Sequence, residues 1–469
     1  MSLTINSVAV IGAGTMGAAI AGLVASAGYP VLLLDMVPTD LTAEEQAQGL
    51  TLDQPNVRNR LVRAGFERAR RARPAAFADE AAERRVTLGN LEDDFDQLAQ
   101  VDWIIEAIIE ELEPKQALMA RVDRLRRPAC IVSSNSSGLP MADIAAGRTA
   151  GFRQHFLGTH FFNPPRYMKL LELIPTADTA PDVIAVMTDF VAAQLGKGVV
   201  RCKDTPNFIG NRLFSFGNSF AVNYALENGY TVPEVDELTG PLLGRPKTGT
   251  FRLVDLIGLD IVVHLAHHLY DLVPGDPYRD ILRAPELNQL WTELMTRRWL
   301  GNKTGQGFYK SSQTAAGERQ FMTLDLKTLT YQVPTPTDFE ALKAVAGLEP
   351  LGDRVTALLS DRWQIDRGAR YVRALLSFEL AYAASCAQEI AHDLKSIDEA
   401  IRWGFGHVVG PFQLWDLLGV ADTVSMIEAA GRSVAPWVKE MLAAGCPTFY
   451  RIEADQVTGY YDWARKQYT

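Results

Sequence analysis

The chain has 469 residues, which is too long for one ordinary domain and predicts two to four domains. Hydrophobic residues make up 47% and charged residues 22% of it, as in a soluble globular protein. The formal net charge of −10 argues against a nucleic-acid-binding protein.

The first predicted elements lie in residues 8–34, which carry no charged side chain over 27 positions. A membrane-spanning helix needs about 20 apolar residues, so length alone would allow one here. However, glycines and Pro30 interrupt the stretch, and residues 8–11 and 31–34 are typical of β-strands. No basic segment with a cleavage site precedes them. The pattern favours a buried strand–helix–strand unit, and we expect a cytoplasmic protein without membrane insertion.

Short apolar runs alternate with helical stretches through the first 199 residues. We predict strands at 8–12, 31–35, 86–90, 103–107, 130–135, 157–162 and 169–174, and helices at 114–127 and 180–194. Nearly continuous apolar strands with helices between them indicate a parallel sheet that is covered on both faces. Residues 1–199 are therefore expected to form an α/β domain.

Helical periodicity dominates from residue 207 onward. We predict a first helical unit at 200–310, a linker with at most a little β structure at 311–353, and a second helical unit at 354–469. The linker prediction depends on a polar stretch that is rich in Gln, Thr and Pro.

The two helical units are copies of one another. At an offset of 162 residues, the matching positions are Ser215, Phe216, Ala221, Ala225, Glu227, Asp236, Glu237 and Gly244 with Ser377, Phe378, Ala383, Ala387, Glu389, Asp398, Glu399 and Gly406. After a one-residue deletion, Phe251, Leu253, Asp255, Leu256 and Gly258 match Phe412, Leu414, Asp416, Leu417 and Gly419. This pattern indicates an internal duplication. A residue present in only one copy is therefore not required by the fold of the unit.

A glycine-rich turn follows the first predicted strand. The segment "GAGTMG" places Gly12, Gly14 and Gly17 between a strand and a helix, where they permit a tight turn, the approach of a pyrophosphate and close helix packing. Asp35 ends the second strand, where a carboxylate binds ribose hydroxyls and repels a 2′-phosphate. The spacing predicts an NAD site in a Rossmann-like, doubly wound sheet. A purely structural glycine turn is the alternative.

His160 and Glu172 flank a segment that cannot continue a strand. The prolines of "NPPR" at 163–166 end the first strand, and if the chain turns back there, the two side chains lie close together. A carboxylate bonded to one imidazole nitrogen raises the basicity of the other, as removal of a hydroxyl proton requires. A purely structural histidine is the competing interpretation.

Three further polar side chains are candidates for a binding site. Asn135 and Ser137 follow a strand whose carboxyl end should face the ligand, where we expect both to be exposed, although turn and cap residues are of the same types. Asn211 is expected in the first turns of the helix that opens the first helical unit, and the equivalent position of the repeat is Arg373. Because the unit folds without an asparagine there, a functional role is favoured for Asn211.

The cysteines give no sign of a metal site. They lie far apart without a CxxC motif, which is typical of free thiols in a reducing compartment. The four positions are Cys130, Cys202, Cys386 and Cys446. We expect no bound metal ion.

Six motifs follow one another between residues 12 and 310, within a resemblance that covers nearly the whole chain. They are "GAGTMG", "IIEAIIEELEPK", "SSNSSG", "THFFNPPRYMKLLELI", "KDTPNFIGNR" and "GNKTGQGFYK". Together they resemble those of the L-3-hydroxyacyl-CoA dehydrogenases of fatty-acid β-oxidation. The duplicated helical part is similar to that of longer bacterial members, in which an enoyl-CoA hydratase domain often follows. The resemblance implies a Rossmann-like N-terminal domain followed by two related all-helical domains.

The resemblance also implies a role for each matching residue. His160 would be the general base on the 3-hydroxyl with Glu172 as its partner, and Asn211 and Ser137 would position the substrate oxygen. Hydride would pass from C3 of the acyl chain to NAD and leave a 3-ketoacyl-CoA. The cofactor site would consist of Gly12, Gly14, Thr15, Met16, Gly17, Asp35, Glu110, Lys115, Asn135, Asn163 and Lys303.

Three positions depart from the commonest form of the family. They are Ser136, Gly138 and Asn207, and none of them removes a proposed catalytic side chain. Asn207 replaces a glycine, and asparagine tolerates left-handed backbone better than most residues.

Seven arginines crowd into residues 58–73 of an otherwise acidic protein. They are Arg58, Arg60, Arg63, Arg68, Arg70, Arg71 and Arg73. The family binds CoA phosphates around a helical excursion at this place, and guanidinium groups suit phosphates. A solvated amphipathic helix is the alternative for any one of them.

The resemblance implies an acyl-CoA substrate, no nucleic-acid partner, and a covalently following or associated enoyl-CoA hydratase module and thiolase. Homologues dimerise through their helical domains, and a second copy within one chain can cover that surface, so a monomer or a homodimer is expected. The competing functions are a dehydrogenase of a non-CoA hydroxy acid on the same scaffold and a non-catalytic NAD-binding protein.

Overall fold

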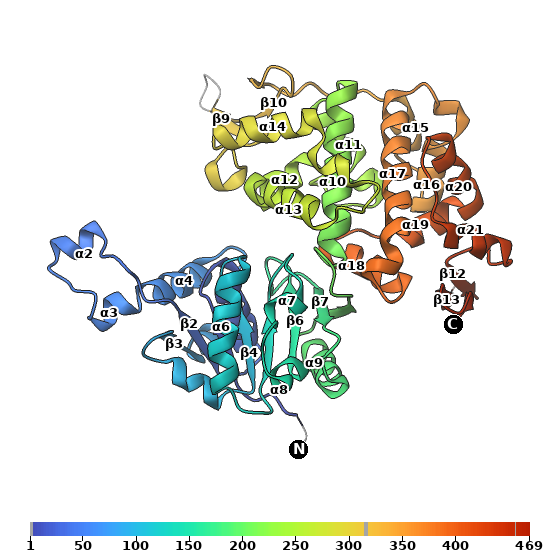
Figure 1. The fold of residues 1–469 in the computed structure, drawn as a ribbon. Coiled ribbons are helices and arrows are strands. Elements are labelled where there is room, and N and C mark those ends of the chain that lie inside the picture. Colours follow the sequence, from blue (N-terminus) through green and yellow to red (C-terminus); the bar gives the residue numbers. More distant parts are fainter. Residues whose placement is uncertain (1–2, 314–317, 455) are drawn as a thin grey trace. The chain divides into compact units, whose positions relative to one another are not determined.

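A computed structural model describes residues 3–313, 318–454 and 456–469 (Figure 1). The chain divides into two compact units, Met1–Phe208 and Ile209–Thr469. No single helix within the described residues is long and apolar enough to cross a membrane. Only α12 (Phe251–Ile257) and α13 (Leu259–Leu272) taken together reach that length, with a bend of 97° between them.

The first unit is built on an eight-stranded sheet in the order β3-β2-β1-β4-β5-β6-β7-β8. The strands are β1 (Val8–Ile11), β2 (Val31–Asp35), β3 (Val86–Asn90), β4 (Trp103–Glu106), β5 (Ile131–Ser134), β6 (Phe156–Phe161), β7 (Leu170–Pro175) and β8 (Gly198–Arg201). All neighbouring pairs are parallel except β6 and β7. The seven predicted strands are confirmed to within one residue at each end. The sequence did not predict β8.

The uncharged stretch near the N-terminus folds as the predicted strand–helix–strand unit, because α1 (Thr15–Ser26) joins β1 to β2. The other helices of this unit are α2 (Ala43–Ala47), α3 (Pro55–Arg58), α4 (Arg60–Arg71), α5 (Glu80–Glu83), α6 (Leu112–Leu125), α7 (Met141–Ile144), α8 (Ala150–Gln154) and α9 (Pro181–Ala193). Alternate strand residues such as Val8, Val10 and Leu33 share one buried cluster with α1, α4 and α9. Residues of the opposite parity, such as Glu106, face α6. Both faces of the sheet are therefore covered, as predicted.

The second unit is largely helical. Its helices are α10 (Gly210–Asn228), α11 (Val232–Leu238), α12, α13, α14 (Pro285–Thr296), α15 (Glu340–Val345), α16 (Leu351–Leu358), α17 (Arg367–Ile390), α18 (Leu394–Phe405), α19 (Pro411–Leu418), α20 (Val420–Ala429) and α21 (Pro436–Ala443). The helical pattern predicted for both copies is confirmed over most of their length.

Each helical copy also ends in a small antiparallel sheet, so the two domains are largely helical rather than all-helical as expected. The strands are β9 (Tyr309–Gln313), β10 (Arg319–Leu324) and β11 (Tyr331–Gln332), and then β12 (Tyr450–Glu453), β13 (Gln456–Asp462) and β14 (Gln467–Tyr468). Many of their residues, for example in "YKSSQ" and "YRIE", are polar and exposed, so they lack the apolar alternation of a half-buried strand. The segment predicted as a linker contains β10, β11 and α15.

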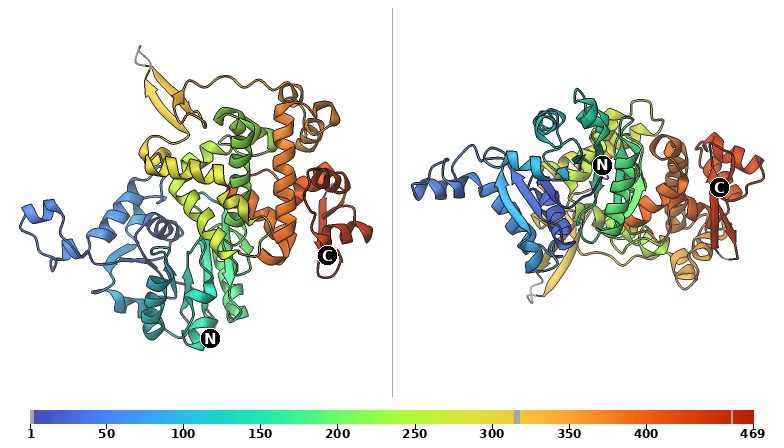
Figure 2. Two further views of the ribbon diagram at one scale, coloured as in Figure 1. Left: turned by 45° about the horizontal axis from the view of Figure 1, so that its top comes forward. Right: turned by 90° about the horizontal axis from the view of Figure 1, so that it is seen from below.

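The two copies pack on each other through α10 and α17, which lie side by side in the left view of Figure 2. Phe216 stacks on Tyr382 with 3.9 Å between ring centroids, and Phe220 stacks on Phe378 with 4.3 Å. Phe216 and Phe378 are equivalent in the repeat, as are Phe220 and Tyr382. Exchanging the copies therefore maps one contact onto the other. This reciprocity is the pattern of a twofold-symmetric dimer, formed here within one chain.

Candidate active site

The glycine-rich turn joins β1 to α1 at the carboxyl edge of the sheet. Gly12 has a φ of 101°, and a Cβ there would collide with the carbonyl oxygen of Ala107. A Cβ at Gly17 would collide with the carbonyl oxygen of Gly12, whereas one at Gly14 would meet nothing within 4 Å. The turn is therefore closed where it packs on protein and open at Gly14, where a pyrophosphate would approach.

The first turn of α1 presents free donors beside Gly14. No side chain caps the helix, and its first backbone bond runs from the N–H of Ala18 to the carbonyl of Gly14 at 3.2 Å. The N–H groups of Thr15, Met16 and Gly17 therefore have no partner within the helix, and the positive end of the helix dipole lies with them. This arrangement fits the phosphates of a dinucleotide.

Asp35 is fixed beside this turn at the end of β2. Its Oδ2 accepts a hydrogen bond from the N–H of Ala13 at 2.8 Å, and its Oδ1 accepts one from Met36 at 2.7 Å. Each carboxylate oxygen has a further lone pair, so ribose hydroxyls still find acceptors here. Together with the turn, these groups fit NAD.

A buried ion-pair network lies at the ends of β4 and β5. The ammonium of Lys115, which is only 1% exposed, lies 2.6 Å from Glu106 Oε1 and 3.3 Å from Glu110 Oε2. Oε1 of Glu110 accepts from Ser136 Oγ at 2.5 Å and from the N–H of Ser137 at 2.8 Å. Burial raises the pKa of Glu110, but the Lys115 charge and these hydrogen bonds outweigh it and lower that pKa below its ordinary value.

This network shows how Glu110 and Lys115 act within the unit. Their side chains pair with each other and, through Glu110, hold the loop that carries Ser137. The predicted contacts of both residues with the cofactor stay a prediction. Sequence reasoning missed Glu106, although a single carboxylate in the otherwise apolar run at 103–107 was a signal that could have found it.

His160 and Glu172 lie directly opposite each other on β6 and β7. The distance from His160 Nδ1 to Glu172 Oε2 is 2.7 Å, and Glu172 is fully buried. The chain turns back through Asn163–Pro164, as the prolines predicted. With the proton on Nδ1 donated to Glu172, Nε2 keeps its lone pair. The structure thus brings together the two side chains that the sequence paired.

The second imidazole nitrogen faces the loop after β5. The distance from His160 Nε2 to Ser137 Oγ is 3.1 Å, and Ser137 is half-buried. The rings of Phe162 and Phe208 lie 4.6 and 5.7 Å from the imidazole centroid. His160 itself is 4% exposed, so Nε2 lies in a largely apolar surrounding that strengthens hydrogen bonds.

Asn135 and Asn163 flank this group of residues. Asn135 was expected to be exposed, but it is buried, because its Oδ1 accepts from the N–H of Phe161 at 2.9 Å and ties the end of β5 to β6. Asn163 is exposed just after β6. The cofactor contacts proposed for both residues remain predictions.

Two predicted site residues belong to the second unit. Asn211 is the second residue of α10 and is 9% exposed. Lys303 lies in the short helix Asn302–Thr304 and pairs with Asp260. Asn207, in the first unit, has a φ of 61°, so it adopts the left-handed backbone that asparagine was expected to tolerate.

The arginine-rich segment forms α3, α4 and the residues that follow. Its arginines that form ion pairs with carboxylates are Arg58, Arg60, Arg70 and Arg71. The exposed arginines that make no ion pair with any described residue are Arg63, Arg68 and Arg73.

A Cβ at Gly65 would collide with the carbonyl oxygen of Ala13, so α4 packs directly on the glycine-rich turn. Sequence reasoning did not single out Gly65.

Two family models match the chain. Residues 7–205 match the model described as 3-hydroxyacyl-CoA dehydrogenase, NAD binding domain, and residues 208–311 match 3-hydroxyacyl-CoA dehydrogenase, C-terminal domain. The chain is 44% identical to a "Probable 3-hydroxyacyl-CoA dehydrogenase" of Deinococcus radiodurans, over 68% of this chain and 87% of that protein.

Longer proteins and a solved structure are also similar. A "Probable 3-hydroxyacyl-CoA dehydrogenase" of Bacillus subtilis is 43% identical over 98% of this chain, which spans only 56% of that protein. A crystal structure of 3-hydroxybutyryl-CoA dehydrogenase from Escherichia coli aligns with a TM-score of 0.63 at 23% identity, over 94% of this chain and 100% of that chain. This last similarity supports the fold alone.

Proposed function

Since the chain belongs to the 3-hydroxyacyl-CoA dehydrogenase family and carries its NAD-binding domain, we propose that it oxidises L-3-hydroxyacyl-CoA to 3-ketoacyl-CoA with NAD. We further propose that this reaction serves fatty-acid β-oxidation. The observation that carries the proposal is the 2.7 Å contact between His160 and Glu172, at the same sheet edge as the glycine-rich turn.

His160 acts as the general base in this proposal. Its Nε2 accepts the proton of the 3-hydroxyl while the C3–H bond breaks, and Glu172 stabilises the imidazolium through Nδ1. The glycine-rich turn and Asp35 would hold NAD, which would supply the acceptor for the hydride from C3. The O–H and C–H bonds are lost together, and a C=O double bond forms between C3 and its oxygen.

Ser137 and Asn211 position the oxygen that reacts. The Ser137 hydroxyl lies 3.1 Å from His160 Nε2, where it holds the place that the substrate hydroxyl would take. Asn211 supplies an amide donor, which suits a developing carbonyl oxygen. The loop that carries Ser137 is held by Glu110, so its position does not depend on the substrate.

The exposed arginines favour a CoA thioester over a free hydroxy acid. Arg63, Arg68 and Arg73 lie on or just after the helix that packs on the glycine-rich turn, and no carboxylate among the described residues neutralises them. The phosphates of CoA are ligands of the matching charge. A free hydroxy acid would offer these three side chains a single carboxylate and no phosphate.

The chain spans about half the length of several relatives, among them a "Putative fatty acid oxidation complex trifunctional enzyme" of Rickettsia felis, of which it covers 55%. We therefore propose an enoyl-CoA hydratase module or partner and a thiolase as companions. Because the second helical copy covers the twofold surface of the first, we propose that this chain works as a monomer rather than a homodimer.

The experiment is to compare NADH formation from 3-hydroxybutyryl-CoA and from free 3-hydroxybutyrate. We expect kcat/KM for the thioester to be at least about 100-fold higher than for the free acid, because the free acid lacks the CoA phosphates and their charge-assisted contacts. Equal or better turnover of the free acid would overturn the CoA assignment. No NADH from either substrate would favour a non-catalytic NAD-binding protein.

A further inference from the structure

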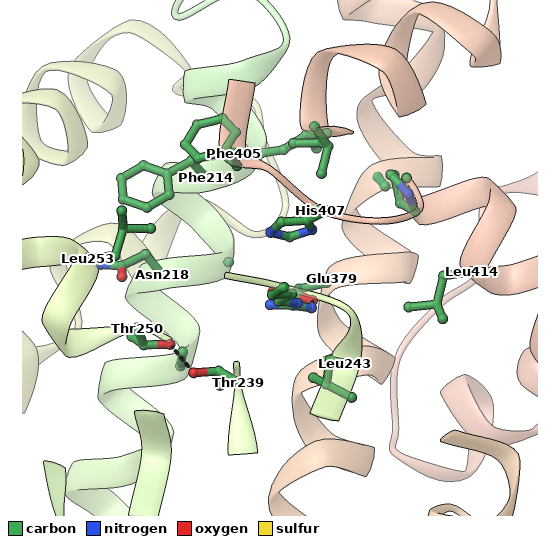
Figure 3. Close-up of a pocket in the computed structure, with 18 of the residues that line it drawn as sticks. Phe214, Asn218, Thr239, Leu243, Thr250, Leu253, Glu379, Phe405, His407 and Leu414 are labelled. Atoms are coloured by element: carbon green, nitrogen blue, oxygen red, sulfur yellow. Dashed lines mark hydrogen bonds and ion pairs between the residues drawn. The ribbon is translucent and has the colours of Figure 1, made fainter. Parts of the chain in front are cut away.

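A cavity of about 120 Å³ lies within the second unit, between its two helical copies (Figure 3). Equivalent positions of the repeat line it from opposite sides. The main pairs are Asn218 with Leu380, Leu243 with Phe405, Arg245 with His407, and Leu253 with Leu414. The cavity therefore lies on the approximate twofold axis that relates the copies.

The backbone supports this pairing at one further point. Arg245 follows Gly244, which has a φ of 67°, and His407 follows Gly406, which has a φ of 70°. The same left-handed glycine thus directs the chain toward the cavity in each copy. At one end of the cavity, Phe214 stacks on Phe405 with 5.1 Å between ring centroids.

The walls of the cavity carry no uncompensated charge. Arg245 makes two contacts with Glu379, from Nη1 to Oε1 at 3.1 Å and from Nη2 to Oε2 at 2.5 Å. Burial and the nearby Arg245 charge lower the pKa of His407 well below its ordinary value, so its imidazole is neutral near neutral pH. A charged group would find no counter-ion here, so the cavity suits an uncharged ligand.

The same side of α10 carries Asn211. Asn211, Phe214 and Asn218 are spaced by three and four residues, so their side chains lie in a row along the helix. With a rise of about 1.5 Å per residue, Phe214 lies about 4.5 Å and Asn218 about 10.5 Å beyond Asn211. An extended chain advances about 1.2 Å per bond, so it covers these distances in roughly four to nine bonds.

We propose that this cavity holds the end of the substrate's acyl chain and that the protein prefers chains of about eight to twelve carbons. The inference rests on the proposed function, in which Asn211 positions the 3-oxygen and the chain continues from C3 along α10. A cavity of about 150 Å³ holds benzene, so this one takes about four or five carbon atoms. A four-carbon substrate would end before reaching it.

The first test fills the cavity. Leu253→Trp places an indole in it from α12, and Leu256→Trp is the matched control, because Leu256 lies on the same helix, is 61% exposed and does not line the cavity. We expect Leu253→Trp to lower the ratio of kcat/KM for 3-hydroxydecanoyl-CoA over 3-hydroxybutyryl-CoA by about tenfold or more, and Leu256→Trp to leave the ratio unchanged. An unchanged ratio in Leu253→Trp would overturn the proposal.

The second test changes the polarity of the cavity without filling it. Asn218 is 7% exposed, and its Nδ2 has no hydrogen-bond partner among the described residues. Asn218→Leu copies the equivalent Leu380 of the second copy and removes this donor. We expect a KM for 3-hydroxydecanoyl-CoA that is lower by about three- to fivefold. A higher KM would mean that the cavity binds a polar group, and would contradict an alkyl chain there.

The wild-type length profile separates this inference from the proposed function. If the protein turns over 3-hydroxybutyryl-CoA and has the same kcat/KM for the 3-hydroxyoctanoyl, 3-hydroxydecanoyl and 3-hydroxyhexadecanoyl thioesters, the cavity assignment alone is overturned. Absence of turnover at every chain length would overturn the proposed function and this inference with it.

Discussion

The two helical copies of the second unit share the side chains that hold their frame. Asp255 accepts from the N–H groups of Phe308 and Tyr309 at 2.9 and 2.8 Å, and Asp416 accepts from Phe449 and Tyr450 at 2.7 and 2.9 Å. Each carboxylate thus fixes the start of its copy's small sheet.

A second aspartate repeats in the same way. Asp236 accepts from the N–H of Phe251 at 2.6 Å and from the Tyr309 hydroxyl at 2.6 Å, and Asp398 accepts from the N–H of Phe412 at 2.8 Å and from the Tyr450 hydroxyl at 2.8 Å. These contacts join helix starts to the small sheet in both copies. They hold the same part of the frame in each copy.

The copies differ at the position where the first carries its proposed substrate contact. Asn211 is the second residue of α10, whereas its equivalent Arg373 lies inside α17 and donates to the carbonyls of Leu359 and Ser360 just after α16. On the proposed mechanism, the duplication separates two tasks. The first copy carries the amide that contacts the substrate, and the second uses the same position to secure its own helices.

The largest expected effect on stability tests the aspartate contacts that both copies share. Asp255→Ala and Asp416→Ala each leave two buried or partly buried N–H groups without an acceptor, so we expect each to lower the free energy of unfolding by about 3 kcal/mol. Urea titration measures this, with Asp422→Ala, an exposed residue, as a control that changes it by less than about 0.5 kcal/mol. If only one of the two aspartate variants lowers the free energy of unfolding, the two carboxylates do not play equivalent structural roles.

The next effect tests the difference between the copies. Asn211→Ala should lower kcat/KM for a 3-hydroxyacyl-CoA by about 100-fold, as removal of one donor to a developing oxyanion does. Arg373→Ala is the matched control and should change kcat/KM by less than about twofold, because Arg373 contacts only protein among the described residues. Comparable losses in both variants would contradict the separation of tasks.

A smaller effect concerns pH. Burial raises the pKa of Asp416 to about 7 and that of Asp255 to about 6. The folded state therefore holds protons that the unfolded state releases, and stability from these groups is present at low pH and lost as pH rises through the folded pKa. Between pH 8 and pH 6, Asp416 should contribute about 1 kcal/mol of added stability, and Asp255 clearly less.

Unfolding at both pH values measures the contribution of each carboxyl. Asp416→Asn should reduce the gain in stability on acidification from pH 8 to pH 6 more than Asp255→Asn does. The reverse order would mean that the burial of these two carboxyls is not what sets their pKa values.

The smallest effect concerns the approximate twofold packing of the copies. Double-mutant cycles with leucine for Phe216 and Tyr382, and for Phe220 and Phe378, should give coupling energies of about 0.5 to 1 kcal/mol each. The two values should agree, because one stack maps onto the other. A coupling energy in one pair alone would show that the two equivalent stacks do not contribute equally.

The sequence predicted the elements whose signals are local. The strand positions followed from short apolar runs, and the pairing of His160 with Glu172 followed from prolines that forced the chain to turn between two strands. The roles of Gly12, Gly14 and Gly17 followed from their spacing, and each is matched by the space around its Cα.

Features that depend on distant contacts were not predictable. Asn135 is buried by a bond to Phe161, because β5 and β6 become neighbours in the sheet. The enclosure of Lys115 by Glu106 and Glu110 depends on how α6 packs on β4. The small sheets at the ends of the copies lack an apolar pattern, since buried aspartates hold them. The cavity between the copies needed the packing of α10 on α17.

The most direct test of the account is NADH formation by His160→Gln, measured with a 3-hydroxyacyl-CoA across the pH range. We predict a kcat about 1,000-fold below that of the wild type, because glutamine cannot accept the hydroxyl proton. His155→Gln, just before β6, should retain wild-type kcat, since among the described residues its Nδ1 contacts only the carbonyl oxygen of Gly151. Wild-type kcat in His160→Gln would contradict the account.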